Sequence, residues 1–357
     1  MRGTWMRIAE VAPLYESVPP QLYGGTERVV SYLTEELVKQ GHDVTLFASG
    51  DSETAAKLIS PCKKSLRLDP DCRDSLAAHI VMLDEVYRRA KDFEFIHFHT
   101  DYLHFALASR MSIAHVTTLH GRLDLPELKI VYRQFPELPL ISISDDQRRP
   151  IWWANWRATI YHGLPSDLYR LHPDPGKYLA FIGRVSPEKR LDRAIELAID
   201  AGVPLRIAAK VDEADKKYFE SEIKPKLDHP LIEWTGEIGE HEKQEFLGNA
   251  IALLFLIDWP EPFGLVMIEA MACGTPVIAF NAGSVPEVID DGSTGFVVKN
   301  MDQARNAVRN IETIGREGCR RVFERRFTAD RMAADYLAQF SLLIKQSHAC
   351  LSAADVP

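Results

Sequence analysis

The sequence predicts an α/β protein with two doubly wound domains, and three observations support this fold class. The chain has 357 residues, which is long enough for about two domains. Short apolar segments alternate with longer amphipathic ones, as in βαβ units with parallel sheets. The alternation stops over residues 162–177, where Gly-Leu-Pro-Ser-Asp and His-Pro-Asp-Pro-Gly are typical of loops, and then resumes. We therefore expect Rossmann-like domains at residues 1–165 and 175–328, facing a central cleft where ligands of such folds bind.

Each element follows from the local pattern. In the first domain, a helix is indicated by Val29, Val30, Leu33 and Leu37, which recur at helical spacing. The expected elements of this domain are strands at 6–13, 44–48, 94–99, 115–119 and 138–143, and a helix at 26–40. In the second domain we expect strands at 178–182, 204–209, 231–235, 251–256, 276–280 and 295–298. The helices expected after the linker are 188–201, 213–227, 240–249, 263–273, 302–325 and 328–346.

The composition is that of an ordinary globular protein and excludes several classes. Hydrophobic residues make up 46% of the chain, and the formal net charge is −9, which argues against nucleic acid as a main partner. The longest apolar run, residues 250–257, is far too short to span a membrane. Five scattered Cys without a CxxC pair are typical of reduced thiols. Without an apolar signal segment after residue 5, we expect a cytoplasmic protein, whose natural start at Met1 or Met6 stays open.

Two carboxylates eight positions apart form the most specific motif. Glu261 lies in a Pro-flanked loop before a predicted helix, and Glu269 lies within that helix. The backbone amides of Phe263, Gly264 and Leu265 lie between them at the positive end of the helix, which is a natural anion site. Carboxylates accept hydrogen bonds from sugar hydroxyls, so the motif fits an extended ligand with phosphates between two polyols. The alternative is an amphipathic helix that merely has acidic residues at its start.

A second motif pairs Arg184 with Lys189, after a strand and at the start of a helix. Two cations at this spacing can grip a diphosphate and stabilise the charge of a departing nucleotide. A surface salt bridge is the alternative interpretation. The third motif, Tyr23-Gly24-Gly25-Thr26-Glu27, is neither a GxGxxG fingerprint nor a Walker A string. Its glycines could bring backbone amides close to a phosphate, or form a plain turn and helix N-cap.

Together, in this order, the three motifs resemble the retaining nucleotide-sugar glycosyltransferases of family 4, which have the two-domain GT-B fold. The resemblance runs from about Met6 to about residue 345, and the Glu-x7-Glu string is its most specific part. It implies an N-terminal acceptor-binding domain, a C-terminal nucleotide-sugar-binding domain, and a crossover helix and tail at residues 329–357 that return to the first domain.

The resemblance also implies roles for single residues. Arg184 and Lys189 would bind the donor diphosphate, Glu269 the ribose hydroxyls, and Glu261 with the backbone of Phe263, Gly264 and Leu265 the donor sugar. Gly24 and Gly25 would approach the diphosphate from the first domain. His120, at the end of an apolar strand, is similar to the family's active-site histidine. The fit is softer at residues 281–287, where the family more often has a second glycine.

Tyr23, His97, His99 and Asp101 are expected on the acceptor side. His97 and His99 alternate along a strand and so share one face. A metal site is not favoured, because Asp101 is the only nearby carboxylate in the sequence and no second His pair completes a ligand set. The preferred interpretation is a polar strand end that lines the acceptor side of the cleft.

We expect transfer of a sugar from a nucleoside diphosphate, with UDP-glucose as the family's implied donor, and no separate cofactor or metal. Arg184, Lys189 and the helix start would stabilise the leaving diphosphate, and retention by front-face attack is favoured. A nucleotide-sugar epimerase of the same fold and a non-catalytic binding module are the alternatives. The acceptor, whether small molecule, saccharide or lipid, and the oligomeric state stay open. Basic residues between Lys57 and Arg67 allow peripheral membrane contact, but an ordinary solvated loop is favoured.

Overall fold

The computed structural model describes residues 5–21 and 24–354, so the predicted acceptor-side residue Tyr23 lies outside the described part of the chain. The chain divides into two compact units. Unit 1 consists of the described residues of Met1–Gly163 and Ala329–Pro357, and unit 2 is Leu164–Thr328. Residues 166–174, which the sequence leaves between the predicted domains, belong to unit 2, as do residues 164–165, which it places in the first domain. The Leu164 amide donates to the Phe327 carbonyl and the His172 amide to the Cys273 carbonyl.

Unit 1 is built on a parallel sheet with the strand order β3-β2-β1-β4-β5-β6-β7, which is the doubly wound order. The strands are β1 (Arg7–Val11), β2 (Asp43–Phe47), β3 (Lys57–Ile59), β4 (Phe95–Phe98), β5 (His115–Thr118), β6 (Leu140–Ser142) and β7 (Trp156–Thr159). The helices are α1 (Gly25–Lys39), α2 (Ser75–Arg88), α3 (Phe105–Ala108), α4 (Pro126–Gln134) and α12 (Ala329–Ala354), with short helical turns at Ala90–Asp92 and Asp146–Ile151.

Successive strands are added in one direction from β1 to β3 and in the other from β4 to β7. The switch point between β1 and β4 positions the candidate residues of unit 1. Val11 of β1 is paired in register with Phe98 of β4 and with Phe47 of β2. Strands β1 and β4 are almost wholly buried, because a parallel sheet covered on both faces leaves little surface for polar residues. Glu10 and His97 are exceptions to this apolar rule and face each other across β1 and β4.

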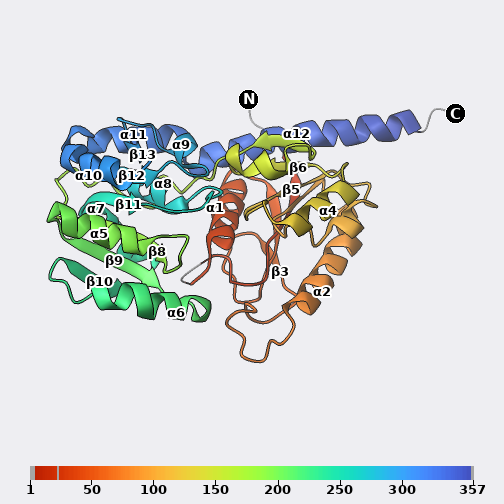
Figure 1. The fold of residues 1–357 in the computed structure, drawn as a ribbon. Coiled ribbons are helices and arrows are strands. Elements are labelled where there is room, and N and C mark those ends of the chain that lie inside the picture. Colours follow the sequence, from red (N-terminus) through yellow and green to blue (C-terminus); the bar gives the residue numbers. More distant parts are fainter. Residues whose placement is uncertain (1–4, 22–23, 355–357) are drawn as a thin grey trace. The chain divides into compact units, whose positions relative to one another are not determined.

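Helix α12 returns to unit 1 after the chain has completed unit 2, as expected for the crossover helix. It packs against α1 and β5, and Figure 1 shows it in blue beside the elements of the N-terminal sequence. Tyr336 and Phe340 of α12 are fully buried. The Phe340 ring stacks on Phe95 of β4 with a centroid distance of 4.2 Å, so apolar burial explains why this helix is held here.

Unit 2 has a second parallel sheet in the order β10-β9-β8-β11-β12-β13, again doubly wound. Its strands are β8 (Tyr178–Arg184), β9 (Leu205–Lys210), β10 (Ile232–Gly236), β11 (Ala250–Phe255), β12 (Val277–Phe280) and β13 (Gly295–Val298). Its main helices are α5 (Leu191–Ala201), α7 (Glu240–Gly248), α8 (Leu265–Ala272), α9 (Val285–Val288), α10 (Met301–Asn310) and α11 (Arg316–Arg326). The expected fold class, two Rossmann-like domains and a returning C-terminal helix, is confirmed.

Two predicted helices of unit 2 are interrupted. The segment expected as one helix over 213–227 is a series of short pieces, Glu213–Asp215, α6 (Lys216–Tyr218), Phe219–Ile223, which is a π-helix, and Lys224–Lys226. Pro225 lies in the last piece and cannot donate a helical hydrogen bond. The segment expected over 302–325 breaks between α10 and α11, with a helical turn at Ile311–Thr313 and Gly315 before the second helix.

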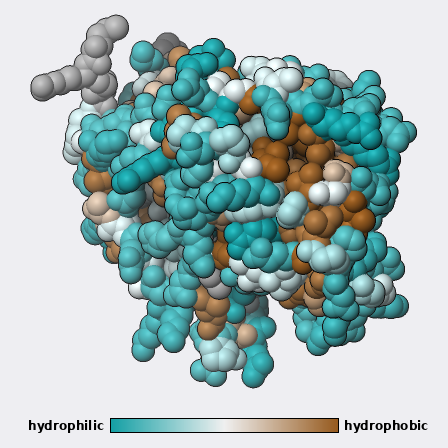
Figure 2. Space-filling model, turned by 90° about the vertical axis from the view of Figure 1, so that its left-hand side faces the viewer, coloured by the Kyte–Doolittle hydropathy of each residue, from teal (hydrophilic) through white to brown (hydrophobic). Residues whose placement is uncertain are grey.

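Figure 2 shows the face on the left-hand side of Figure 1, which is mostly hydrophilic but carries a patch of hydrophobic residues on its right. Among the described helices, none is both long and apolar enough to cross a membrane.

Candidate active site

The candidate residues of unit 2 gather at the carboxyl ends of three neighbouring strands, β8, β11 and β12. The loops after these strands are bonded to one another: the Asp258 amide donates to the Glu188 carbonyl at 2.8 Å, and the Ser284 amide to the Glu261 carbonyl at 3.0 Å. The Ser284 hydroxyl also donates to the Phe263 carbonyl at 2.8 Å. The loops are therefore fixed to each other at the switch point between β8 and β11, where doubly wound sheets bind ligands.

Lys189 and Glu261 form an ion pair, although they are 72 positions apart in sequence. Their side chains are 17% and 14% exposed, so solvent or a ligand can reach them. The Lys189 ammonium also lies 5.1 Å from the centre of the Trp259 ring, an arrangement that stabilises a cation. The structure thus brings together two predicted site residues, but in a pair that an incoming anion must open.

Arg184, at the end of β8, is surrounded by carboxylates. It donates to Glu188 at 2.8 Å and lies 3.8 Å from Asp212 and 3.7 Å from Asp215. Its buried Nε has no hydrogen-bond partner among the described residues. A guanidinium with an unused donor is suited to bind a phosphate oxygen.

The start of α8 supplies the predicted anion site. Gly264 has a φ of 79° and precedes the helix, and a Cβ there would lie 2.9 Å from Met267 and 3.0 Å from Phe255. Glycine is therefore required by both the left-handed backbone and the close packing. Leu265 begins the helix and Phe263 is buried, so the loop presents its backbone rather than its side chains. The first amides of a helix lack intrahelical acceptors and carry partial positive charge.

Glu269 lies one turn further along α8 and is only 2% exposed. Its carboxylate accepts a hydrogen bond from Lys243 of α7 at 2.7 Å, and Glu240 lies 3.9 Å from the same ammonium. Lys243 keeps the buried charge of Glu269 paired. Sequence reasoning missed Lys243, because its only local signal is a charged position on a short polar helix.

Gly24 and Gly25 precede and begin α1 in unit 1. A Cβ on Gly24 would lie 2.7 Å from Pro20, so glycine is needed for this close approach. Gly25 is exposed at the helix start, whereas Glu27 is buried in the first turn. Burial, together with the nearby Glu16 carboxylate, raises the pKa of Glu27 to about 6.

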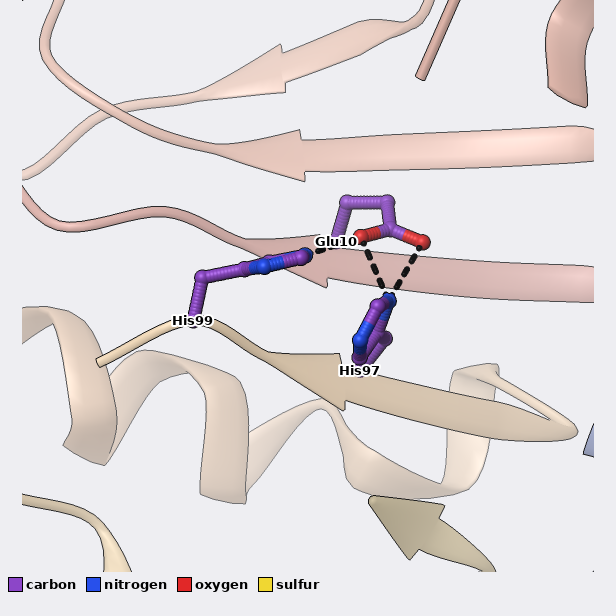
Figure 3. A group of neighbouring side chains, drawn as sticks. All are labelled: Glu10, His97 and His99. Atoms are coloured by element: carbon purple, nitrogen blue, oxygen red, sulfur yellow. Dashed lines mark hydrogen bonds and ion pairs between the residues drawn. The ribbon is translucent and has the colours of Figure 1, made fainter. Parts of the chain in front are cut away.

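A second cluster lies in unit 1, where Glu10 of β1 meets His97 and His99 at the end of β4. Figure 3 shows the carboxylate between the two imidazoles. His97 Nδ1 lies 3.2 Å from Oε1 of Glu10, and His99 Nε2 lies 2.8 Å from Oε2. All three are buried. This corrects the expectation that His97 and His99 line the acceptor side, because neither reaches the surface.

His120 extends this cluster towards the carboxyl end of β5. Its Nε2 lies 2.8 Å from Nδ1 of His99, and its ring stacks on His162 with a centroid distance of 5.3 Å. His120 itself is half-buried. Asp101 follows β4 with a φ of 49° and is exposed, so of the described acceptor-side residues it is the one that reaches solvent.

Burial controls the protonation of the cluster. It lowers the pKa of His97 and of His99 to about 3 and holds the pKa of His120 well below its usual value. The imidazoles are therefore neutral at physiological pH. Burial raises the pKa of Glu10, an effect that the hydrogen bond from His99 opposes.

The same three residues are the group with metal-ligand chemistry among the described residues, since their ligand atoms all lie within 4.8 Å of one another. Sequence reasoning missed Glu10 and took Asp101 as the only nearby carboxylate. The signal that could have found it was a single charge inside an otherwise apolar strand, which requires a buried partner.

Comparisons with known proteins identify the family of the chain. The family described as Glycosyl transferases group 1 matches residues 170–323, and Glycosyltransferase Family 4 matches residues 23–163. The alpha-maltose-1-phosphate synthase of Mycolicibacterium smegmatis is 26% identical over 349 residues, covering 82% of this chain and 84% of that protein. A probable sucrose-phosphate synthase of Thermosipho melanesiensis is 40% identical over 190 residues, covering 50% of this chain but only 44% of that protein.

The fold is also that of solved glycosyltransferase structures. The Anabaena protein HepE, solved in complex with UDP and glucose, aligns with a TM-score of 0.73 at 17% identity, covering 94% of this chain and 99% of HepE. The two family matches fall on the two units, and both units carry the doubly wound sheet that the family shares. The chain therefore belongs to glycosyltransferase family 4 and is an enzyme of this type with the GT-B fold.

Proposed function

We propose that this glycosyltransferase moves a sugar from a nucleoside diphosphate, with UDP-glucose as the first candidate donor, to a hydroxyl acceptor with retention of configuration. The Lys189–Glu261 pair beside the start of α8 is the observation that carries the proposal. It combines a cation for a phosphate with a carboxylate for a sugar hydroxyl, and both stay reachable. The solved complexes of HepE with UDP and with UDP-glucose support the choice of donor.

Donor binding would replace the present partners of Lys189 and Glu261 with groups of the donor. A phosphate oxygen would take the place of Glu261 at the Lys189 ammonium, and a second would bind the guanidinium of Arg184, which is 33% exposed. The released Glu261 carboxylate would then accept hydrogen bonds from the sugar, together with the backbone at Phe263, Gly264 and Leu265. Because the ion pair is still reachable, a phosphate can replace Glu261 at Lys189, and charge-assisted bonds to phosphate would offset the loss of the pair.

Glu269 would hold the ribose hydroxyls, and Lys243 would keep its carboxylate ionised and oriented. The predicted contact of Gly24 and Gly25 with the diphosphate, and the predicted place of His120 beside the donor sugar, stay predictions. Because Arg184, Lys189 and the α8 terminus supply positive charge for the leaving diphosphate, we propose that transfer needs neither a metal nor a further cofactor.

Front-face attack is the proposed route to retention. The acceptor hydroxyl attacks the anomeric carbon on the face from which the diphosphate departs, and a leaving-phosphate oxygen takes the acceptor proton. A double displacement would need a carboxylate placed beneath the anomeric carbon, whereas Glu261 is better used on the ring hydroxyls. Isolation of a covalent sugar adduct on any Asp or Glu would contradict this route.

The test is donor hydrolysis, followed by mass spectrometry, across UDP-glucose, GDP-mannose and UDP-N-acetylglucosamine, with and without EDTA. We expect turnover of one donor that EDTA leaves unchanged, and an NMR product spectrum with the anomeric configuration of the donor. Inversion, or activity that EDTA abolishes, would contradict the proposal. Formation of an isomeric nucleotide sugar without acceptor would instead favour an epimerase.

A further inference from the structure

A continuous line of hydrogen bonds runs through the buried cluster of unit 1 from α12 to His120. Tyr336 Oη lies 3.0 Å from Thr118 Oγ1, which lies 2.8 Å from His97 Nε2. Beyond Glu10 the line continues through His99 to His120. Every step joins groups that can each donate or accept in only certain combinations, so the direction of one bond determines the next.

The carboxylate at the centre sets those directions. Burial raises the pKa of Glu10, whereas the hydrogen bond from His99 favours its ionised form. When Glu10 is ionised it only accepts hydrogen bonds, so His97 then carries its proton on Nδ1 and His99 on Nε2. His97 Nε2 then accepts from the Thr118 hydroxyl, which in turn accepts from Tyr336. His99 Nδ1 likewise has no proton and must accept from Nε2 of His120.

The last step leaves a lone pair on Nδ1 of His120. This atom is buried and has no hydrogen-bond partner among the residues that the structure describes. In the opposite direction, His99 would present a lone pair to the Glu10 carboxylate at 2.8 Å unless Glu10 held a proton, and His120 would bury an N–H without an acceptor. An ionised Glu10 cannot donate a hydrogen bond, so the carboxylate favours the first direction.

We propose that Glu10 and His99 are positioning residues that hold His120 in the tautomer with an unprotonated Nδ1, so that His120 receives a hydrogen bond from a substrate hydroxyl. The proposal rests on the proposed function, because it needs His120 to meet the sugar donor or the acceptor. It adds that Glu10, acting through His99, determines which nitrogen of His120 donates and which accepts. No substrate touches the Glu10 carboxylate.

The geometry also gives the returning helix a part in this arrangement. Tyr336 of α12 supplies the hydroxyl at the far end of the line, and its ring lies 4.7 Å from that of His97. Through Thr118, Tyr336 supplies a hydrogen bond to Nε2 of His97. The Nδ1–H of this imidazole can then donate a hydrogen bond to Glu10. One carboxylate thus receives two N–H groups, which compensates part of the cost of burying its charge.

The first test reads the tautomers directly in the free, full-length protein by nitrogen-15 NMR of its histidines. We expect the proton on Nδ1 of His97 and on Nε2 of His99 and His120. A proton on Nδ1 of His120, or nitrogen shifts of His97 and His99 that change on addition of Zn²⁺ as for metal ligands, would overturn the proposal. Because no transfer is measured, this result is independent of the proposed function.

The second test separates the two contacts of His99. An asparagine amide oxygen lies near the place of Nδ1 and can accept from His120, whereas a glutamine amide lies near Nε2 and reaches Glu10 instead. Since a positioned acid–base or polar group contributes roughly 10²-fold or more, we expect His99→Gln to lower kcat at least about 10-fold. His99→Asn should retain most of kcat, and KM for the donor should change little in either variant.

His104 provides the matched control. It is also buried and hydrogen-bonded on both nitrogens, to Thr100 at 3.1 Å and Thr117 at 2.8 Å, but it is not part of the line to His120. His104→Gln should leave the His120 tautomer and kcat unchanged. Equal losses in His99→Asn and His99→Gln, with the wild-type His120 tautomer in both, would overturn the proposal.

Discussion

The two units carry charged residues at the same topological place but differ in how far these residues are exposed. In unit 1, Glu10 lies at the β1/β4 switch point with its side chain fully buried between neutral imidazoles. In unit 2, Lys189 and Glu261 lie by the β8/β11 switch point as a pair that is 17% and 14% exposed. A fully buried carboxylate can orient its hydrogen-bond partners but cannot replace them with a ligand. A reachable ion pair can give up its partner to a ligand. We therefore infer that the same place in the fold serves positioning in unit 1 and ligand binding in unit 2.

The largest effect should follow from breaking the exchangeable pair at its carboxylate. Glu261→Gln removes the charge that we propose binds the sugar hydroxyls and leaves Lys189 free for phosphate. Loss of one group that stabilises the transition state typically costs about 10²- to 10³-fold in kcat, and we expect a loss of this size with the affinity for UDP retained. Transfer assays and calorimetric titration with UDP measure the two quantities.

The control for Glu261 is a carboxylate in an ion pair outside the predicted site. Glu233 of β10 accepts from Arg206 at 2.6 Å and is 58% exposed, so Glu233→Gln should leave transfer unchanged. Full activity in Glu261→Gln would show that this carboxylate is a structural partner of Lys189, and the comparison between the two units would fail.

A smaller effect is expected at the cation of the same pair. Lys189→Met removes the ammonium but keeps an unbranched side chain beside Trp259. One charge-assisted contact to phosphate is worth about 1.5–3 kcal/mol, so UDP affinity should fall roughly 10- to 100-fold. Isothermal titration of UDP checks this value. Unchanged affinity at low salt would place the diphosphate elsewhere.

The sequence was sufficient for the fold because alternation, loop chemistry and helix starts are local signals. Helical spacing at Val29 and Leu33 predicts α1, and the Pro-flanked Glu261 before an apolar helix predicts the loop at α8. The strand order follows once two doubly wound domains are recognised, because such sheets share one winding rule. The meeting of Lys189 with Glu261 follows from that order too, since both lie at the carboxyl ends of neighbouring strands.

The missed features are those that depend on tertiary contacts. Glu10 is one charge in an apolar strand, and nothing local shows that His97 and His99 face it across 87 and 89 positions. Asp212 and Asp215 resemble a solvated helix start until β8 places Arg184 beside them. The edge strand β3 (Lys57–Ile59) was interpreted as a basic loop, because an edge strand can carry lysine without losing its pairing.

Within unit 1, the buried carboxylate of α1 should make stability depend on pH, whereas exposed carboxylates should not. The pKa of Glu27 rises from 4.5 to about 6 in the folded protein, so the folded state binds the proton more tightly. Stability is then lost as the pH rises from about 4.5 through 6, by about 2 kcal/mol for a shift of this size. Glu27→Gln should recover this amount at pH 7.5, and the gain should shrink towards pH 5 in urea unfolding. Glu127→Gln, at an exposed first-turn position of α4, should show no such trend, and an equal gain there would contradict the assignment.

The smallest effect tests whether the sealed cluster is a connected network or a set of separate contacts. Tyr336→Phe keeps the ring packed against His97 and Phe340 and removes only the hydroxyl that lies 3.0 Å from Thr118. A typical hydrogen bond contributes about 1 kcal/mol, and Thr118 can still donate to His97 when this bond is lost. The free energy of unfolding in urea should therefore fall by about 1 kcal/mol, against no change for Tyr87→Phe on the exposed face of α2. A loss several times larger would mean that the hydroxyl also fixes the direction of the bonds at His97 and Glu10. A loss no larger than that of Tyr87→Phe would mean that the Tyr336 hydroxyl does not help to hold α12 on unit 1.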